Sequence, residues 1–435
     1  MLVIEEMKMK KRILSLAAVL ALVLSALAVN IETDRTWYLA GETMTVRVTA
    51  NDALIAYAEL CDTHGLAAGT VVGLKGQTGT GIIELPSNLH SGYYVLSAYT
   101  RDQAEVSQRL VAVVNPLRKH VYDDIRWVEL THPDSLSYPE TGGLSQWSMV
   151  NDQWSMLNGQ CSMFNGQWST FKVRETEGHI VKARVKNDYD GQTFRGSQIC
   201  PSLSIIGQQI HYFEGKMIDD STAVFYTYGI SGKLPLVLSA MSSTGVSLPI
   251  EMVSPFATLL PKQLPQLVFH YQRSEVEARS INMQRYQLLK GDNGNLATGD
   301  SLDYEATLYG IQPDLSYNLD EYRQFLTIRE VLLEYVECVK RTRVHDVPKL
   351  IVRRRQDIFN SSLPTLVLID GMPVFDVDRL LNYDARRIHY INIYGDQYIF
   401  GNDIYNGILS FVTRSGRLTN YPTEPNMQYL VYDFP

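Results

Sequence analysis

The chain has 435 residues, of which 45% are hydrophobic and 20% are charged, and its formal net charge is −8. These fractions are those of an ordinary globular protein, and the length allows roughly two to four domains. Acidic and basic residues are spread without long blocks, which argues against a nucleic-acid-binding protein, since such a protein needs a clustered basic face.

Residues 1–28 have the pattern of a secretory signal peptide. A basic segment, 8–12, precedes an apolar run from Ile13 to Leu27, and residues 26–28 (Ala-Leu-Ala) give a small-x-small cleavage site. A retained anchor is the competing interpretation, but the run is short for a membrane-spanning helix, which needs about 20 apolar residues. We therefore expect an exported protein, periplasmic or associated with the outer membrane.

Residues 29–115 carry the pattern of an antiparallel β-sandwich. Met44, Val46 and Val48 alternate with polar residues, which is the period of a strand buried on one face. Further strand-like runs are separated by Gly, Asn and Ser residues, and they lie at 53–60, 82–85, 93–99 and 110–114. Short strands at this spacing predict a sandwich.

Two pieces of this region resemble a macroglobulin-type domain of the α2-macroglobulin family: residues 32–43 (Glu-Thr-Asp-Arg-Thr-Trp-Tyr-Leu-Ala-Gly-Glu-Thr) and residues 85–100, with their Leu-Pro and Gly-Tyr-Tyr elements. The resemblance implies the sandwich fold. Covalent protease capture in that family uses an internal thioester from a Cys-Gly-Glu-Gln motif, and none of the four cysteines begins such a motif. Non-covalent protease binding, with cleavage in residues 134–172, stays an alternative function.

The four cysteines, Cys61, Cys161, Cys200 and Cys338, are scattered along the chain. In an exported protein they allow two disulfides, with three possible connectivities. Small buried side chains without bridges are the other interpretation. The sequence leaves both open.

Residues 116–172 read as a linker that contains a seven-residue repeat, starting at Gln146, Gln153, Gln160 and Gln167. Its Asn-Gly and Asn-Asp pairs form turns, which excludes a coiled coil. The repeats place Trp147, Trp154 and Trp168 at equivalent positions. Either these rings form an exposed ladder that binds carbohydrate or peptide, or a duplicated loop packs them on the adjoining sandwich.

A second β-sandwich is expected over residues 173–290. Val181, Ala183 and Val185 alternate on one face, and further strand-like runs lie at 223–227, 234–239 and 266–269. Residues 291–319 follow as a polar linker rich in Gly, Asn and Asp.

The pattern of residues 320–420 predicts a small α+β domain. Residues 421–435 are expected to form a C-terminal tail. Thr327 and Glu330 form a capping box ahead of an apolar helical stripe. Strands are expected at 350–352, 365–369, 388–394 and 407–413. The predicted fold class is therefore multidomain and mainly β, with two antiparallel β-sandwiches followed by a small α+β domain.

Segments 327–336, 364–374, 388–394 and 407–416 of this domain resemble, in order, the plug domain of TonB-dependent outer-membrane receptors. In those receptors the plug sits inside a β-barrel that follows it in the chain. Only 19 residues (435 − 416) follow Gly416, whereas the smallest barrels need about 8 strands of about 9–11 residues. We therefore expect that this chain is not a transporter by itself.

Motifs for catalysis and for metal or cofactor binding are missing from the sequence. It has no His-Glu-x-x-His, paired Cys-x-x-Cys or Gly-x-Ser-x-Gly, and its nine histidines show no metal-ligand spacing. We expect a non-catalytic protein with no cofactor, no metal, no small-molecule substrate and no nucleic-acid partner.

The function that these patterns favour is an envelope adaptor that docks on an outer-membrane barrel or an envelope protein complex. Its contact residues are expected on loops, where binding residues concentrate. They are Asp370, Gly371, Met372, Pro373, Tyr394, Tyr398 and Phe400. The alternative is that these residues merely close the domain. A carbohydrate-binding surface protein, using the three tryptophans, is the third function considered.

Overall fold

The structure is a computed structural model that describes residues 29–101, 106–130, 178–207, 209–293, 307–344, 347–353, 363–400, 403–416 and 426–435, with Glu175, Leu418 and Tyr421. The fold is multidomain and mainly β, as the sequence predicts. The described chain forms two compact units: the first contains residues up to Gly178, residues 256–293 and Pro435, and the second contains 179–255 and 307–434. The predicted signal peptide and the seven-residue repeats lie outside the described residues.

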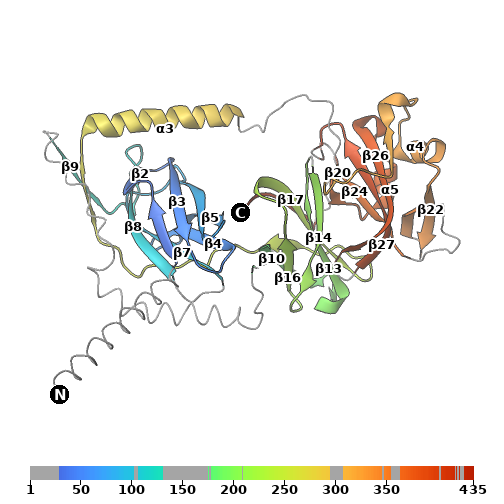
Figure 1. Ribbon diagram of the computed structural model, residues 1–435, viewed down its shortest axis with the longest axis horizontal. Helices are drawn as coiled ribbons and strands as arrows, with labels where there is room; N and C mark the ends of the chain where they lie inside the picture. The colour runs from blue at the N-terminus through green and yellow to red at the C-terminus, as the bar shows by residue number, and fades with distance from the viewer. Residues whose placement is uncertain are drawn as a thin grey trace, which may run out of the picture. The chain divides into compact units, whose positions relative to one another are not determined.

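The first unit is built on a sandwich of a three-stranded and a five-stranded sheet, drawn in blue and cyan in Figure 1. The smaller sheet has the order β1 (Asn30–Thr33), β3 (Thr43–Thr49), β6 (Thr78–Glu84). The larger has the order β2 (Trp37–Leu39), β8 (Val106–Val114), β7 (Gly92–Tyr99), β4 (Ile55–Cys61), β5 (Leu66–Gly73). All pairs are antiparallel except β2 with β8.

The core of this sandwich follows the alternation seen in the sequence. Met44, Val46 and Val48 of β3 are fully buried, while the residues between them face outward. They pack against apolar side chains of the opposite sheet, such as Leu60 and Leu96. Period-two burial of this kind is the direct consequence of the strand pleat, so the predicted sandwich over 29–115 is found.

Residues 256–293 belong to the first unit, although the sequence places them in the second sandwich. Strand β19 (Leu267–Tyr271) pairs in parallel with β9 (Ile125–Glu129). Helix α3 (Arg273–Asn293) follows, and it lies along the first sandwich in Figure 1. Arg279 of α3 donates to both carboxylate oxygens of Glu42 and its guanidinium stacks over Trp37. An alternating run shows that a strand forms, but not which sheet the strand joins.

The second unit contains a sandwich with one edge supplied by the end of the chain. One sheet has the order β15 (Lys216–Met217), β16 (Thr222–Thr227), β10 (His179–Val185), β18 (Ile250–Met252). The other has the order β20 (Thr307–Leu308), β14 (Gln209–Glu214), β13 (Ile199–Ile205), β17 (Gly232–Ser242), β28 (Gln428–Phe434). Strand β28 was expected as a tail, but it pairs with β17 and buries Tyr432 and Phe434 in the core.

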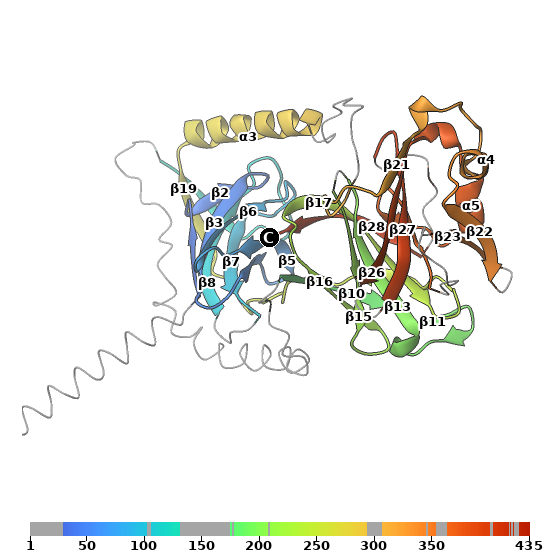
Figure 2. The same cartoon turned by 45° about the vertical axis from the view of Figure 1, so that its right-hand side comes forward.

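The remainder of the second unit is a mixed five-stranded sheet flanked by helices. Its order is β21 (Leu315–Asn318), β26 (Ile388–Phe400), β27 (Asp403–Thr413), β24 (Leu366–Ile369), β25 (Met372–Pro373), and only β24 with β27 is parallel. Helices α4 (Ile328–Glu334) and α5 (Val377–Leu381) pack on this sheet, and Figure 2 shows them beside it. The capping box of Thr327 and Glu330 is present, which confirms the predicted helix start.

The mixed sheet is not free-standing, because the sandwich covers its other face. Leu366, Leu368 and Ile408 of the sheet pack against Ile210 and Tyr212 of β14. The α+β elements predicted for this part of the chain are all found, but they share a core with the sandwich of the same unit. None of the described helices is long and apolar enough to cross a membrane.

Candidate functional sites

The turn that was expected to contact a partner is buried. Asp370 is 1% exposed, and its carboxylate accepts hydrogen bonds from the backbone N–H groups of Thr413 and Leu418 and from the Thr413 hydroxyl. Burial raises the pKa of Asp370, against the lowering effect of these bonds. Gly371, Met372 and Pro373 are also buried. The exposure assumed for this turn is wrong, because the Asp-Gly pair faces strand β13 rather than solvent.

The three aromatic contact candidates lie on strand β26 rather than on a loop. Tyr394 is 1% exposed, and Tyr398 and Phe400 are half-buried against the cluster around Tyr212. Beyond Tyr394, the described parts of strands β26 and β27 pair only with each other, so residues 397–400 and 403–406 form a two-stranded ribbon. The outer face of this ribbon carries Ile399 and Ile404, directly opposite each other and 70% and 41% exposed.

A cationic hairpin lies at the base of that ribbon. Strands β22 (Val339–Val344) and β23 (Val347–Val352) pair in antiparallel register, and β23 packs on β27 near Asn406. The described residues of this hairpin and the next residue carry five exposed cations and no carboxylate: Lys340, Arg341, Arg343, Lys349 and Arg353. None of the five forms an ion pair with another described residue. The sequence analysis did not single out this cluster.

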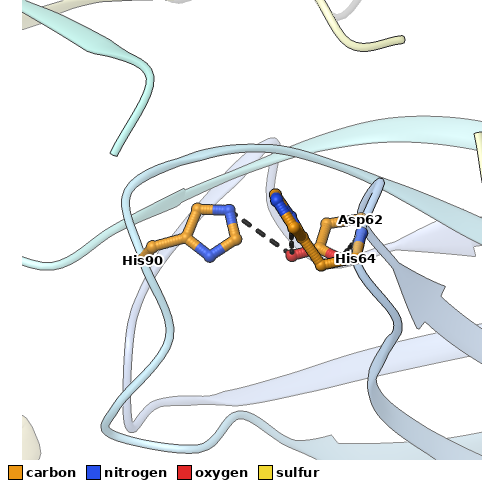
Figure 3. A group of neighbouring side chains, drawn as sticks. All are labelled: Asp62, His64 and His90. Atoms are coloured by element: carbon orange, nitrogen blue, oxygen red, sulfur yellow. Dashed lines mark hydrogen bonds and ion pairs between the residues drawn. The ribbon is translucent and has the colours of Figure 1, made fainter. Parts of the chain in front are cut away.

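A cluster of metal-ligating side chains lies at one end of the first sandwich. Asp62 and His64 belong to the turn between β4 and β5, and His90 belongs to the loop that precedes β7. One ligand atom from each residue lies within 4.8 Å of the others. Figure 3 shows both imidazole rings directed at the Asp62 carboxylate, and dashed lines mark the two contacts.

The two oxygens of Asp62 have different tasks. Oδ1 accepts the backbone N–H groups of His64 (2.6 Å) and Gly65 (2.7 Å), which fixes the turn and the carboxylate plane. Oδ2 lies 3.6 Å from Nδ1 of His64 and 3.4 Å from Nε2 of His90. Asp62 is 8% exposed, whereas about half of the His64 side chain is in solvent. The cluster is therefore buried on one side and open on the other.

Tyr94 sets the orientation of His90. The Tyr94 hydroxyl donates to the backbone carbonyl of His90 (3.0 Å) and also lies 3.1 Å from Nδ1 of its ring. Burial raises the pKa of Tyr94 above its ordinary value, so the hydroxyl keeps its single proton. Since that proton goes to the carbonyl, we assign the proton of the His90 ring to Nδ1, where it bonds to the Tyr94 oxygen. Nε2 then carries a free lone pair.

The loop that carries His90 is fixed by hydrogen bonds from a neighbouring segment. The Asn115 side-chain amide donates to the carbonyls of Ser87 and Leu89, and the Ser91 N–H donates to Asp123. Tyr122, from the same segment, lies with its ring 4.3 Å from that of His64. These contacts hold the two loops in place, so the ligand cluster is preorganised rather than assembled from mobile ends.

Sequence reasoning missed this cluster because only half of it is local. Asp62-Thr63-His64-Gly65 gives one signal, a carboxylate and an imidazole two residues apart in a tight turn. His90 is 26 residues further on (90 − 64), and only the pairing of β4 with β7 brings it to the turn. The histidines show no metal-ligand spacing in the sequence, but the fold brings His64 and His90 together with Asp62.

The structure describes only some of the cysteines and none of the tryptophans that the sequence analysis singled out. Cys61, Cys200 and Cys338 are free thiols, and Cys161 lies outside the described residues. Trp147, Trp154 and Trp168 lie outside them as well, as does the segment 134–172 in which protease cleavage was considered. The carbohydrate-binding and protease-binding hypotheses stay predictions.

Comparisons with known proteins give little that bears on these sites. No protein-family model matches the chain, and no curated protein matches its sequence. Among solved structures, it is similar to Escherichia coli alpha-2-macroglobulin activated by porcine elastase, with a TM-score of 0.19 and 13% identity over 54% of this chain and 20% of the other. A Salmonella alpha-2-macroglobulin mutant has a TM-score of 0.18 and 11% identity over 54% and 15%. The DIP-gamma IG1+IG2 structure has a TM-score of 0.15 and 9% identity over 56% and 99%.

This chain therefore spans about a fifth of the length of the Escherichia coli protein. Similarities of this size support no argument about function. The resemblances to macroglobulin-type domains and to receptor plugs accordingly stay predictions from the sequence.

Proposed function

We propose that the protein is an exported, non-catalytic adaptor that docks on an acidic face of a cell-envelope protein through the β22–β23 hairpin of its second unit. The observation that carries the proposal is the excess of cationic side chains on the described residues of this hairpin. Arg341 and Arg343 are exposed and form no ion pair with another described residue, although the whole chain has a net charge of −8. A local cationic field on an acidic protein favours encounter with an anionic partner.

The β22–β23 hairpin is anchored to the mixed sheet, so the backbone that carries its cations is held in place. Leu350 and Val352 of β23 are buried in the core of the mixed sheet. The Val352 N–H donates to Thr365, and the Val352 carbonyl accepts from the side chain of Asn406. Arginines on an anchored strand lose less conformational freedom on binding than arginines on a mobile tail. Their planar guanidinium groups suit bidentate binding of carboxylates.

Exposed apolar side chains lie on the β26–β27 ribbon, against whose base the β22–β23 hairpin packs. Ile399 and Ile404 form an exposed cross-strand pair. Protein interfaces combine an apolar centre with a polar rim. The isoleucine pair offers apolar surface, and the hairpin offers cationic side chains. These two residues replace the buried aromatic residues as the apolar part of the proposed contact surface.

The proposal is tested by capture from solubilised outer membranes. The wild-type chain should retain a defined envelope protein, and the double variant Arg341→Glu, Arg343→Glu should retain it at least about 10-fold less, because buried charge pairs at interfaces contribute roughly 2 kcal/mol or more. Arg47→Glu with Arg126→Glu is the matched control, since it makes the same charge change at exposed positions of the first unit.

Capture should also weaken as salt rises, because salt screens the attraction that brings the cationic hairpin to an acidic partner. Equal capture by the hairpin variant and the control would overturn the assignment of the surface. The absence of any envelope protein bound to the wild-type chain would overturn the adaptor function itself.

A further inference from the structure

We propose that Asp62, His64 and His90 form a binding site for a divalent first-row transition metal ion, with Zn²⁺ as the best fit. This site lies in the first unit, and it is independent of the docking surface proposed above. The chemistry of the ligands is two imidazole nitrogens and one carboxylate oxygen, which suits Zn²⁺ and related ions.

Two of the three spacings between ligand atoms are close to those of a tetrahedral site. Zn–N and Zn–O distances near 2.1 Å with tetrahedral angles place ligand atoms about 3.3–3.5 Å apart. Oδ2 of Asp62 lies 3.4 Å from Nε2 of His90 and 3.6 Å from Nδ1 of His64. The three ligand atoms all lie within 4.8 Å of one another, and Nδ1 of His64 also lies 3.2 Å from the Thr63 hydroxyl, which a metal ion would have to displace.

The assigned protonation of His90 leaves room for a cation between its Nε2 atom and the Asp62 carboxylate. With the ring proton of His90 on Nδ1 and bonded to Tyr94, the lone pair of Nε2 faces the ionised oxygen of Asp62. Two acceptors that face each other across 3.4 Å repel unless a positive charge lies between them. A proton on Nε2 is the competing occupant, and the Zn²⁺ titration distinguishes the two.

The surroundings resemble the outer ligand sphere of known metal sites. Metal-bound histidines generally donate their second ring nitrogen to a fixed acceptor, and ligating carboxylates are themselves hydrogen-bonded. Here Tyr94 accepts from His90, and two backbone N–H groups hold Oδ1 of Asp62. The solvent-exposed side near His64 leaves a fourth position for water or for a ligand from another molecule.

The two nitrogens argue against calcium and magnesium, because these hard cations prefer oxygen ligands. A bound Zn²⁺ would cross-link the β4–β5 turn to the loop that precedes β7. It would thereby fix one end of the sandwich, so binding should also stabilise the first unit.

The first experiment is a titration of the full, untagged, metal-stripped chain with Zn²⁺ by calorimetry, in competition with a chelator. One tight site is expected, and Ca²⁺ should give no saturable binding. His64→Ala and His90→Ala should each weaken Zn²⁺ binding by at least about 100-fold, since even loss of an outer-sphere partner costs about 10–100-fold. His270→Ala is the matched control, because His270 lies on β19 away from the cluster, and it should bind as the wild type does.

The second experiment tests Tyr94 as a positioning residue. Tyr94→Phe keeps the buried ring but removes the acceptor for Nδ1 of His90, and it should weaken Zn²⁺ binding by about 10–100-fold. Circular dichroism should show an unchanged fold for this variant and for His64→Ala, whose side chain is largely exposed.

X-ray absorption at the zinc edge identifies the ligands directly. Only nitrogen and oxygen at about 2.0–2.2 Å are expected. Sulfur at about 2.3 Å would move the ion to a cysteine and overturn the proposal. Unchanged Zn²⁺ affinity in a folded His64→Ala chain, or no saturable Zn²⁺ binding by the wild-type chain, would overturn it equally.

Discussion

The two units build their sandwiches from the chain in different ways. The first uses eight strands that follow one another from Asn30 to Val114, and residues 256–293 then pack against it. The second takes one strand of its larger sheet from the end of the chain: β28 pairs with β17, and Gly232 lies opposite Phe434, 202 residues away (434 − 232). A contiguous sandwich can close as its own segment collapses, whereas a discontiguous one must first close a long loop.

Both units nevertheless fasten a remote segment with a buried carboxylate. In the first unit, Glu59 is 0% exposed and accepts from the backbone N–H groups of Thr258 and Leu259 and from the Tyr99 hydroxyl. In the second unit, Asp370 holds Thr413 and Leu418 in the same manner. A buried carboxylate surrounded by backbone donors fixes a segment that has little apolar surface of its own.

The largest expected effect on stability comes from weakening the packing of strand β28 on the sandwich of the second unit. Phe434→Ala should destabilise the second unit by about 3–5 kcal/mol, because it leaves a cavity where a buried ring stood. Val431→Ala, on the exposed face of the same strand, should change stability by less than about 0.5 kcal/mol. Urea denaturation monitored by hydrogen exchange should place the loss in residues 179–252 and leave residues 30–114 unaffected. Equal loss in both sandwiches would show that the units do not unfold separately.

The corresponding change in the first unit is at Glu59. Glu59→Ala should destabilise that unit by about 3 kcal/mol, since it leaves two buried donors, the Leu259 N–H and the Tyr99 hydroxyl, and the half-buried Thr258 N–H without this acceptor. Backbone amides of residues 257–259 should exchange faster, while those of β28 should not change. If peptides that cover Thr258 and Leu259 keep their protection, the carboxylate does not fasten this segment.

A smaller effect tests how the mixed sheet meets the sandwich of the second unit. Gly371 has φ +95°, and a Cβ there would lie 2.9 Å from the carbonyl oxygen of Ile205 and 3.0 Å from the Ile210 side chain. Gly371→Ala should therefore cost about 2–3 kcal/mol, from backbone strain and from contact. Gly245 has φ +85° and open space around it, so Gly245→Ala should show the strain alone, about 1–2 kcal/mol. Identical losses by thermal unfolding would contradict the packing of the turn on β13.

The most gradual effect is the pH dependence of stability. Burial raises the pKa of Glu59 in the folded chain, so the folded state holds its proton more tightly than the unfolded state. This contribution to stability is fully present below the unfolded pKa, about 4.3, and is lost as the pH rises through the folded pKa. One proton limits the slope to about 1.4 kcal/mol per pH unit.

Glu59→Gln cannot titrate, so the wild-type free energy of unfolding minus that of this variant should fall with rising pH above about 4.3. Carboxyls whose pKa is lowered, such as Asp320, act in the opposite direction at lower pH and are common to both proteins. A difference that is flat or rises with pH would show that the hydrogen bonds to Glu59 outweigh its burial.

Much of the fold could be predicted from local patterns. The alternation of Met44, Val46 and Val48 and the capping box of Thr327 with Glu330 both correspond to the elements expected. The sites were far less predictable. Asp370 and Tyr394 read as loop residues from their sequence neighbours, but the sandwich packed against the mixed sheet buries both. The exposed pair Ile399 and Ile404 gave no local signal, because exposure of one ribbon face depends on what covers the other.

The sequence by itself determined where elements such as β3 and α4 form, because the side-chain period and the caps of an element depend on residues within a few positions of each other. It did not predict helix α3 or strand β28. Only the tertiary structure decided which sheet β19 and β28 join, and which loop brings His90 to Asp62. Strand pairing and ligand clusters join residues that are distant in the chain, and their energies depend on backbone partners and burial that no local pattern contains.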